Sequence, residues 1–193
     1  MSDEETYDVL CLLGTDHHPF ARMLGWMDAW QRGAGQTARV LVQHGFTRPL
    51  GRTALTQVDF LGHHDLTRLL SRSRAVVCHG GPGTIFDCRR AGLLPVVLPR
   101  SAEHGEHVDN HQVLFTQRLA SAQLIDRVQT EDELHRALHS ALQRSRTTLE
   151  SADDAAVAAS TQRLSALVDE ALTHQHQHQQ QQSRVRRREE PHP

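Results

Sequence analysis

The sequence predicts an α/β protein built on a Rossmann-like, doubly wound parallel sheet. Short apolar segments alternate with amphipathic ones along most of its 193 residues, and this is the rhythm of strand and helix in a βα protein. The apolar segments are continuous runs rich in Val and Leu. Such runs are typical of parallel strands that helices cover on both faces, whereas strands with one wet face alternate apolar and polar residues.

The first part of the chain should contain three strands and two helices. An apolar run predicts a strand over residues 7–13, and Pro19, a residue that suits a first helical turn, begins a helix over 19–32. The other elements predicted there are strands over 38–43 and 56–60 and a helix over 64–72.

The second part continues the alternation. A strand over 75–78 runs into a glycine-rich turn, and the next helix, over 84–91, ends at Gly92, where a C-terminal glycine usually stands. Thr130 and the acidic residues behind it form a capped helix start. The remaining predicted elements are strands over 94–98 and 123–125 and helices over 108–119 and 131–143.

Composition and length define one folded domain, over residues 1–172, closed by an Ala-rich helix over 151–171. Residues 173–193 are rich in His, Gln and Arg and offer almost nothing to bury, so we expect a disordered tail. A formal net charge of -2 provides no basic surface for nucleic acid.

The cysteines and the N-terminus indicate the compartment. Cys11, Cys78 and Cys88 form no CxxC pair, which fits a reducing environment. The acidic start lacks an apolar leader, and no run approaches the ~18 apolar residues of a membrane-spanning helix. We therefore expect a cytoplasmic protein with no nucleic-acid partner.

The turn after the strand at 75–78 is the most informative segment. Its glycines let the backbone approach a ligand, and the N–H groups of the new helix, at the positive end of its dipole, attract anions. His79 would donate to a phosphate, and Asp87, one turn into the helix, would accept from ribose hydroxyls. The glycines are Gly80, Gly81 and Gly83. This segment predicts a site for the diphosphate of a nucleotide-bound substrate.

A plainer interpretation of the turn stays open. Thr84 and Asp87 have the spacing of a capping box, in which both side chains serve only helix N–H groups. The surrounding loops favour a site, because ligands of open α/β sheets bind beyond the carboxyl ends of the strands. The loops at 14–18, 78–83 and 99–107 should meet there, with a further polar cluster at 107–112.

Other histidines have several interpretations. His17 and His18 lie in the first of these loops, where substrate contact and loop packing are equally good explanations. His135 and His139 have a metal-compatible spacing on one helix, but a solvated helix face explains them better. Histidines of the tail would chelate a metal only adventitiously. We therefore expect no metal site.

Four motif segments belong together: 79–87 (HGGPGTIFD), 91–92 (AG), 95–99 (PVVLP) and 107–112 (HVDNHQ). Together they resemble the C-terminal, donor-binding domain of glycosyltransferase family 28. Residues 9–20 resemble more narrowly the stand-alone soluble subunits of split N-acetylglucosaminyltransferases and their counterparts in bacterial exopolysaccharide assembly. The resemblance covers residues 7–126 and implies a single GT-B-type C-terminal domain. It also implies a nucleotide sugar, usually a UDP-sugar, bound without an obligatory metal or other cofactor.

The resemblance assigns roles to individual residues. By the family pattern, Asp87 bonds the ribose hydroxyls where Glu is usual, and His111 and Gln112 read the sugar where Gln-Gln or Asp-Gln is common. Because His111 departs from that pattern, the sugar stays open. The binding residues implied are Gly14, Thr15, His79, Gly80, Gly81, Gly83, Thr84, Asp87, Asp109, His111 and Gln112.

The implied function is that of the donor-binding subunit of a two-component inverting glycosyltransferase. It would transfer N-acetylglucosamine or another hexose from a UDP-sugar to a lipid-linked or polysaccharide acceptor. The catalytic base and the acceptor site would belong to a membrane-anchored partner, which would hold the chain at the inner face of the membrane. The alternative is a non-catalytic nucleotide-sugar-binding or scaffold subunit, and a metal-handling protein is a weaker one.

Overall fold

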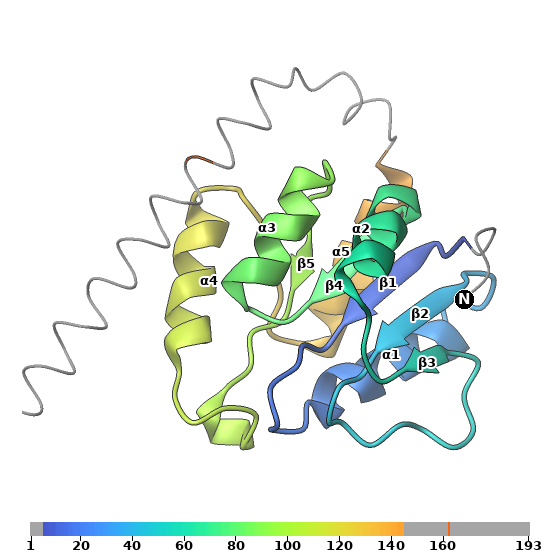
Figure 1. Ribbon diagram of the computed structural model, residues 1–193, viewed down its shortest axis with the longest axis horizontal. Coiled ribbons are helices and arrows are strands. Elements are labelled where there is room, and N and C mark those ends of the chain that lie inside the picture. The colour runs from blue at the N-terminus through green and yellow to red at the C-terminus, as the bar shows by residue number, and fades with distance from the viewer. Residues whose placement is uncertain (1–5, 145–161, 163–193) are drawn as a thin grey trace, which may run out of the picture.

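The computed structural model describes residues 6–144 and residue 162. Within this part, six parallel strands form one sheet in the order β3-β2-β1-β4-β5-β6, with helices on both faces (Figure 1). The predicted fold class, a Rossmann-like doubly wound α/β domain, is confirmed. Apart from residue 162, the helix expected over 151–171 and the tail expected over 173–193 lie outside the described residues.

The elements follow one another in strict βα alternation except between β2 and β3. The strands are β1 (Val9–Leu12), β2 (Val40–Gln43), β3 (Thr56–Val58), β4 (Ala75–Cys78), β5 (Val96–Val97) and β6 (Asp126–Arg127). The helices are α1 (Ala21–Arg32), α2 (His63–Arg72), α3 (Pro82–Arg90), α4 (His111–Ser121) and α5 (Glu131–Gln143), with a short 3-10 helix, η1 (Ala102–His104).

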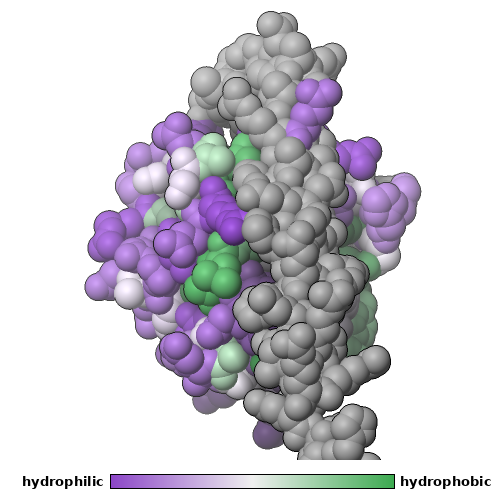
Figure 2. Space-filling view, turned by 90° about the vertical axis from the view of Figure 1, so that its left-hand side faces the viewer, coloured by the Kyte–Doolittle hydropathy of each residue, from purple (hydrophilic) through white to green (hydrophobic). Residues whose placement is uncertain are grey.

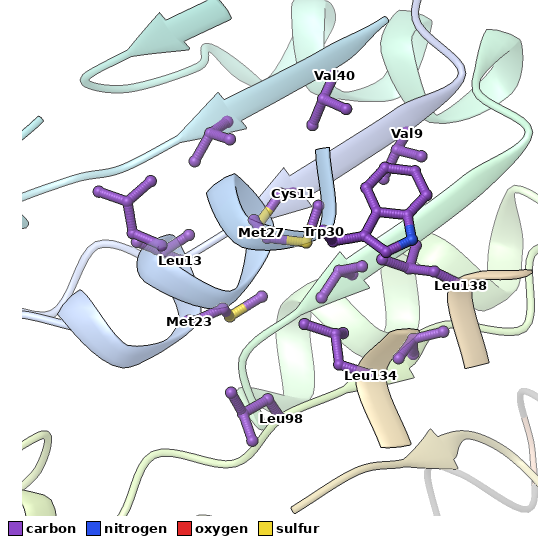
Figure 3. Close-up of a cluster of buried hydrophobic side chains, with 14 of the residues drawn as sticks. Val9, Cys11, Leu13, Met23, Met27, Trp30, Val40, Leu98, Leu134 and Leu138 are labelled. Carbon is purple, nitrogen blue, oxygen red and sulfur yellow. The ribbon is translucent and has the colours of Figure 1, made fainter. Parts of the chain in front are cut away.

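Successive residues of the central strands enter two separate cores, because neighbouring side chains of a strand point to opposite faces. In β1, Val9 and Cys11 belong to one buried cluster, and Leu10 and Leu12 belong to the other. The first cluster packs α1 and α5 on the sheet around Trp30 (Figure 3). The second contains side chains of α2, α3 and α4. Burial on both faces explains why these strands appear in the sequence as continuous apolar runs.

The outer surface is largely polar. On the face shown in Figure 2, hydrophilic residues predominate among the coloured ones, and apolar surface forms small separate areas. Among the described residues, none of the helices has both the length and the apolar character needed to span a membrane.

Two elements late in the chain have bounds that differ from the predicted ones. The helix predicted over 108–119 begins only at His111 and continues to Ser121. The last strand, predicted over 123–125, is β6 at Asp126–Arg127. Gln123, with a φ of 57°, makes the left-handed turn that follows the longer helix. Residues 124 and 125 are buried without being strand residues, so apolar character alone misplaced the strand.

The strand order reverses between β1 and β4. From β1 the sheet grows outward through β2 and β3, and the chain then returns to place β4 on the other side of β1. The two strands pair in parallel, with Leu12 level with Cys78. Because the loops that leave them continue to opposite sides, an opening remains at their carboxyl ends, which is the usual ligand position in an open α/β sheet.

Candidate functional site

A pocket of about 300 Å³ lies at this reversal of strand order. Its volume is at the lower end of the range usual for small-molecule sites, about 300–1,000 Å³. The loop after β1 lines it on one side, and the glycine turn with the start of α3 lines it on the other. The lining includes predicted binding residues from both segments: Gly14, Thr15, His79, Gly81, Gly83 and Thr84.

The start of α3 supplies hydrogen-bond donors to this pocket. The helix begins at Pro82 with Gly81 as its N-cap, and Gly81 makes no side-chain cap hydrogen bond. The first N–H to bond back to the cap is that of Ile85, which donates to Gly81 O at 3.2 Å. The N–H groups of Gly83 and Thr84 precede it and have no acceptor within the helix. Both residues line the pocket, so the helix start is suited to an anion.

The helix start also bears on the capping box considered for Thr84 and Asp87. Thr84 is the third residue of α3 and not its N-cap, so its spacing from Asp87 has no capping role.

Two glycines of the pocket are required by the imidazole of His79. A Cβ at Gly81 would stand 2.2 Å from its Nε2, and a Cβ at Gly14, where φ is +90°, would stand 2.8 Å from its Cε1. Gly83 differs, since a Cβ there would meet nothing within 4 Å. Packing among the described residues therefore does not demand glycine at position 83, whereas close approach of a ligand would.

His79 is neutral in the free protein. Its ring is half-buried, and Nδ1 lies 3.4 Å from Leu12 O, the acceptor for an Nδ1 hydrogen. Burial, and after it the positive charge of Arg100, lowers the pKa of His79 to about 4. With Nδ1–H directed at Leu12, Nε2 carries a lone pair. It can donate to a phosphate oxygen only after it takes up a proton.

Arg100 is a buried cation that sequence reasoning missed. It is 1% exposed and follows β5 directly after a buried run. Its Nη1 donates to His18 O at 2.6 Å and to Glu106 O at 2.9 Å, and its Nη2 donates to Leu13 O at 2.8 Å. The guanidinium carbon lies 4.8 Å from the ring centroid of Phe20. Arg100 thus joins the loop after β1 to the loop after β5, two loops that the sequence predicted to lie side by side.

The charge of Arg100 has no carboxylate bonded to it among the described residues. The nearby Glu106, also buried, receives two bonds from Arg22, at 2.8 Å to Nε and 2.7 Å to Nη2, and one from Ser101 N at 3.1 Å. Arg100 bonds only carbonyl oxygens, and its charge reaches the pocket strongly enough to lower the pKa of His79. Arg100 and the positive end of the α3 dipole both contribute positive potential to the pocket.

Gln43, at the end of β2, fixes the loop on the other side of the pocket. Its Oε1 accepts from Gly14 N at 3.2 Å, and its Nε2 donates to Gly14 O at 3.0 Å and to Asp59 O at 3.0 Å. These bonds hold Gly14 in its left-handed conformation. A polar residue that ends an otherwise apolar strand is the signal that could have singled Gln43 out.

Gln112 connects the glycine turn to the loop after β5. It is buried at the second position of α4, where its Oε1 accepts from Gly80 N at 3.1 Å and from Arg100 N at 3.3 Å. A Cβ at Gly80 would stand 2.9 Å from Thr116 Cγ2. The structure therefore gives Gly80 and Gln112 a packing role beside the pocket, and their contact with a ligand stays a prediction.

Three further predicted residues lie outside the pocket lining. Asp87 is half-buried on α3, while Asp109 and His111 lie at the start of α4. Asp109 Oδ1 accepts from His111 N at 3.0 Å. Their contacts with ribose and sugar hydroxyls stay predictions.

Asp16 and His18, in the loop after β1, form a hydrogen-bonded pair. Asp16 Oδ1 accepts from His18 N at 2.8 Å and contacts His18 Nδ1 at 2.6 Å. Burial alone would raise the pKa of Asp16, but these bonds and the charge of Arg100 outweigh it and lower the pKa to about 2. Asp16 is therefore ionised at every pH at which the protein would be studied.

Fold and site together define a Rossmann-like domain with a pocket suited to an anion where the strand order reverses. The chain belongs to the glycosyltransferase family 28 C-terminal domain family, whose model matches residues 30–170. The family predicted from the motif segments is thereby confirmed. No curated protein matches the sequence significantly.

Solved glycosyltransferases share the fold at low sequence identity. CalG4, the calicheamicin glycosyltransferase, is 15% identical with a TM-score of 0.55, over 87% of this chain and 39% of its own. The spinosyn forosaminyltransferase SpnP is 16% identical with a TM-score of 0.53, over 88% and 42% respectively. Arabidopsis thaliana UGT89C1, solved in complex with UDP, is 18% identical with a TM-score of 0.53, over 87% and 44%. The chain thus spans less than half the length of each of these proteins.

Proposed function

We propose that the pocket between β1 and α3 binds the diphosphate of a UDP-sugar and that the chain is the donor-binding part of an inverting glycosyltransferase. The observation that carries this proposal is the set of groups around the pocket that can bind an anion. The start of α3 offers N–H groups, His79 offers a ring nitrogen, and the buried Arg100 supplies positive charge. Family membership and the UDP complex of a protein with the same fold support a uridine nucleotide.

The chemistry of sugar transfer suits this arrangement. The acceptor oxygen forms a bond to the anomeric carbon as the bond from that carbon to the diphosphate oxygen breaks. The electron pair leaves with UDP, and the acceptor proton passes to a base. Helix N–H groups, a protonated His79 and Arg100 would stabilise the charge that develops on UDP, without an obligatory metal.

We place the acceptor site and the base on another polypeptide. The family match to a C-terminal domain supports this placement, as does the resemblance of residues 9–20 to the stand-alone soluble subunits of split transferases. The partner we propose is a membrane-anchored subunit that binds a lipid-linked or polysaccharide acceptor, so that the heterodimer works at the cytoplasmic face of the membrane. The sugar would be N-acetylglucosamine or another hexose.

Calorimetric titration with UDP, UDP-N-acetylglucosamine and uridine tests the donor site. UDP and the UDP-sugar should bind, and uridine, which lacks the diphosphate, should bind far more weakly. Asp87→Ala should weaken UDP-sugar binding through the lost ribose contact, while Asp132→Ala, on the exposed first turn of α5, should not. Absence of UDP binding would refute the proposal. Equal affinity of the Asp87→Ala and Asp132→Ala variants would remove Asp87 from the site.

Transfer needs a separate measurement, because binding alone also fits a non-catalytic scaffold subunit. The chain and its membrane-anchored partner would be supplied with a radiolabelled UDP-sugar and a lipid-linked acceptor. Label in the lipid fraction that depends on both chains supports the enzyme. UDP-sugar binding with no transfer by the complex favours the scaffold.

A further inference from the structure

Histidine and aspartate side chains from two distant segments gather at the rim of the sheet. Asp16, His17 and His18 come from the loop after β1, and His107, Asp109 and His111 come from the segment that leads into α4. Within each set, metal-binding atoms of the three side chains lie within 4.8 Å of one another. The sets meet where the His18 and His107 rings stack, with 6.0 Å between their centroids.

One pair of ligand atoms in the set at the start of α4 has the spacing that a tetrahedral ion requires. His107 Nδ1 lies 3.5 Å from Asp109 Oδ1, and two ligands at about 2.0–2.1 Å from one tetrahedral Zn²⁺ stand about 3.3–3.4 Å apart. His111 Nδ1 contacts the same oxygen. The two imidazole rings meet edge to face, with centroids 4.5 Å apart. Both Nδ1 atoms therefore converge on one carboxylate oxygen.

The protonation of His107 is the one that a metal ligand needs. The N–H of Asp109 is directed at His107 Nδ1, at 3.4 Å, so Nδ1 is the acceptor and carries the lone pair. The hydrogen is then on Nε2, which lies 3.8 Å from Asp16 Oδ2. A carboxylate that faces the second ring nitrogen of a histidine is the usual outer partner of a metal ligand, where it fixes the ring and its tautomer. Asp16 is itself held by His18.

The site is open to solvent on one side. The side chain of His107 is 13% exposed, whereas those of His111 and Asp109 are 36% and 50% exposed. An ion can therefore enter from solvent, where it would replace the contacts that Asp109 Oδ1 makes with His111. Three protein ligands of a tetrahedral ion would leave the fourth position for water or a ligand.

We propose that His107, Asp109 and His111 bind one divalent transition-metal cation of the Zn²⁺ class and that Asp16, which faces the other ring nitrogen of His107, orients that ring. The imidazole and carboxylate ligands select such an ion over Mg²⁺ or Ca²⁺, which prefer oxygen alone. The proposal gives Asp109 and His111 a role other than the sugar contacts that the family resemblance implies for them, and it leaves the proposed diphosphate site between β1 and α3 unchanged. It also differs from the sequence prediction that no metal site is present.

The test is metal binding by the full-length chain in which the C-terminal histidines His174, His176, His178 and His192 are replaced by Gln, so that they cannot chelate. Co²⁺ is the optical probe, since its visible absorption reports tetrahedral coordination, and Zn²⁺ affinity follows from competition with a coloured chelator. We expect one equivalent of either ion. His107→Ala and His111→Gln should each weaken binding at least about 100-fold, and Asp16→Asn about 10- to 100-fold.

Controls separate this site from others. His135→Ala and His139→Ala, on α5, should leave the affinity unchanged, and so should His17→Ala. Thermal unfolding with and without Zn²⁺ supplies a second measurement: the ion should raise the midpoint of the parent but not of the His111→Gln variant, which shows that both are folded. The proposal is overturned if the parent binds no ion, if His107→Ala and His111→Gln leave binding intact, or if His17→Ala removes it.

Discussion

Binding of a UDP-sugar should cause His79 to become protonated. In the free protein the pKa of His79 is about 4, and its Nδ1 hydrogen is directed at Leu12 O. A phosphate oxygen beside Nε2 accepts hydrogen bonds and cannot donate one. Only the doubly protonated ring can bond Leu12 and the phosphate together, and the negative diphosphate favours that form.

The size of the expected change in UDP-sugar affinity with pH follows from the pKa of His79. At pH 7 about 0.1% of the free protein carries the protonated ring, because the pH is 3 units above the pKa. If the pKa in the complex rises above the range of the assay, the association constant increases tenfold for each unit by which the pH falls. Between pH 7.5 and 5.5 the gain is about 100-fold, or about 2.7 kcal/mol.

Calorimetry measures both the affinity and the number of protons that are taken up on binding. UDP-N-acetylglucosamine is the ligand, because its phosphates do not titrate in this range, and EDTA keeps metals away. Titrations at pH 7.5, 6.5 and 5.5, in buffers of different ionisation enthalpy, should show uptake of about one proton. His79→Asn, which can donate without protonation, should lose the pH dependence, and His107→Gln should keep it. An affinity of the parent that does not change with pH would refute the reasoning and assign the hydrogen to Nε2.

Three further outcomes are expected. The free energy of unfolding should be highest above about pH 6.5 and fall by about 3 kcal/mol as the pH drops toward 4. The reason is that His79, with a pKa of about 4, stays neutral in the folded state while it protonates in the unfolded chain. Urea unfolding of the parent and of His79→Asn measures the difference. Gly83→Ala should weaken UDP binding at least tenfold without lowering the melting temperature, as in Gly25→Ala, because neither Cβ meets a neighbour within 4 Å and Ala favours a helix over Gly. Equal UDP affinity of those two variants would argue against close ligand approach at Gly83. Arg100→Met should cost about 3 kcal/mol of unfolding free energy, since it leaves buried carbonyl oxygens unpaired, and unchanged urea midpoints would contradict that role.

The fold and the pocket were predictable where the signal is local. Continuous apolar runs mark strands buried on both faces. In the glycine turn, the residue that requires glycine is also close in sequence, since the ring of His79 leaves no room for a Cβ at Gly81. The remainder depends on contacts between distant segments. Arg100 bonds Leu13, 87 residues away, and Gln43 bonds Gly14, 29 residues away.

The position of the last strand shows the same limit. Its neighbours at 124 and 125 are apolar and buried, as strand residues would be, yet the length of α4 and the turn at Gln123 determine where the chain rejoins the sheet. Nothing local to the segment encodes that length. The polar cluster at 107–112 was predicted, but its contact with Asp16 was not, because the acceptor role of His107 Nδ1 and its neighbour Asp16 appear only once two loops meet.

The burial of Arg100 sets how the pocket should respond to ionic strength. Lysines or arginines on a protein surface attract phosphate through water and lose most of that attraction when mobile ions gather round them. A guanidinium that is 1% exposed is out of reach of such ions, and the dipole of α3 ends inside the pocket. Affinity for the donor should therefore change little between dilute buffer and the salt concentration of a cell.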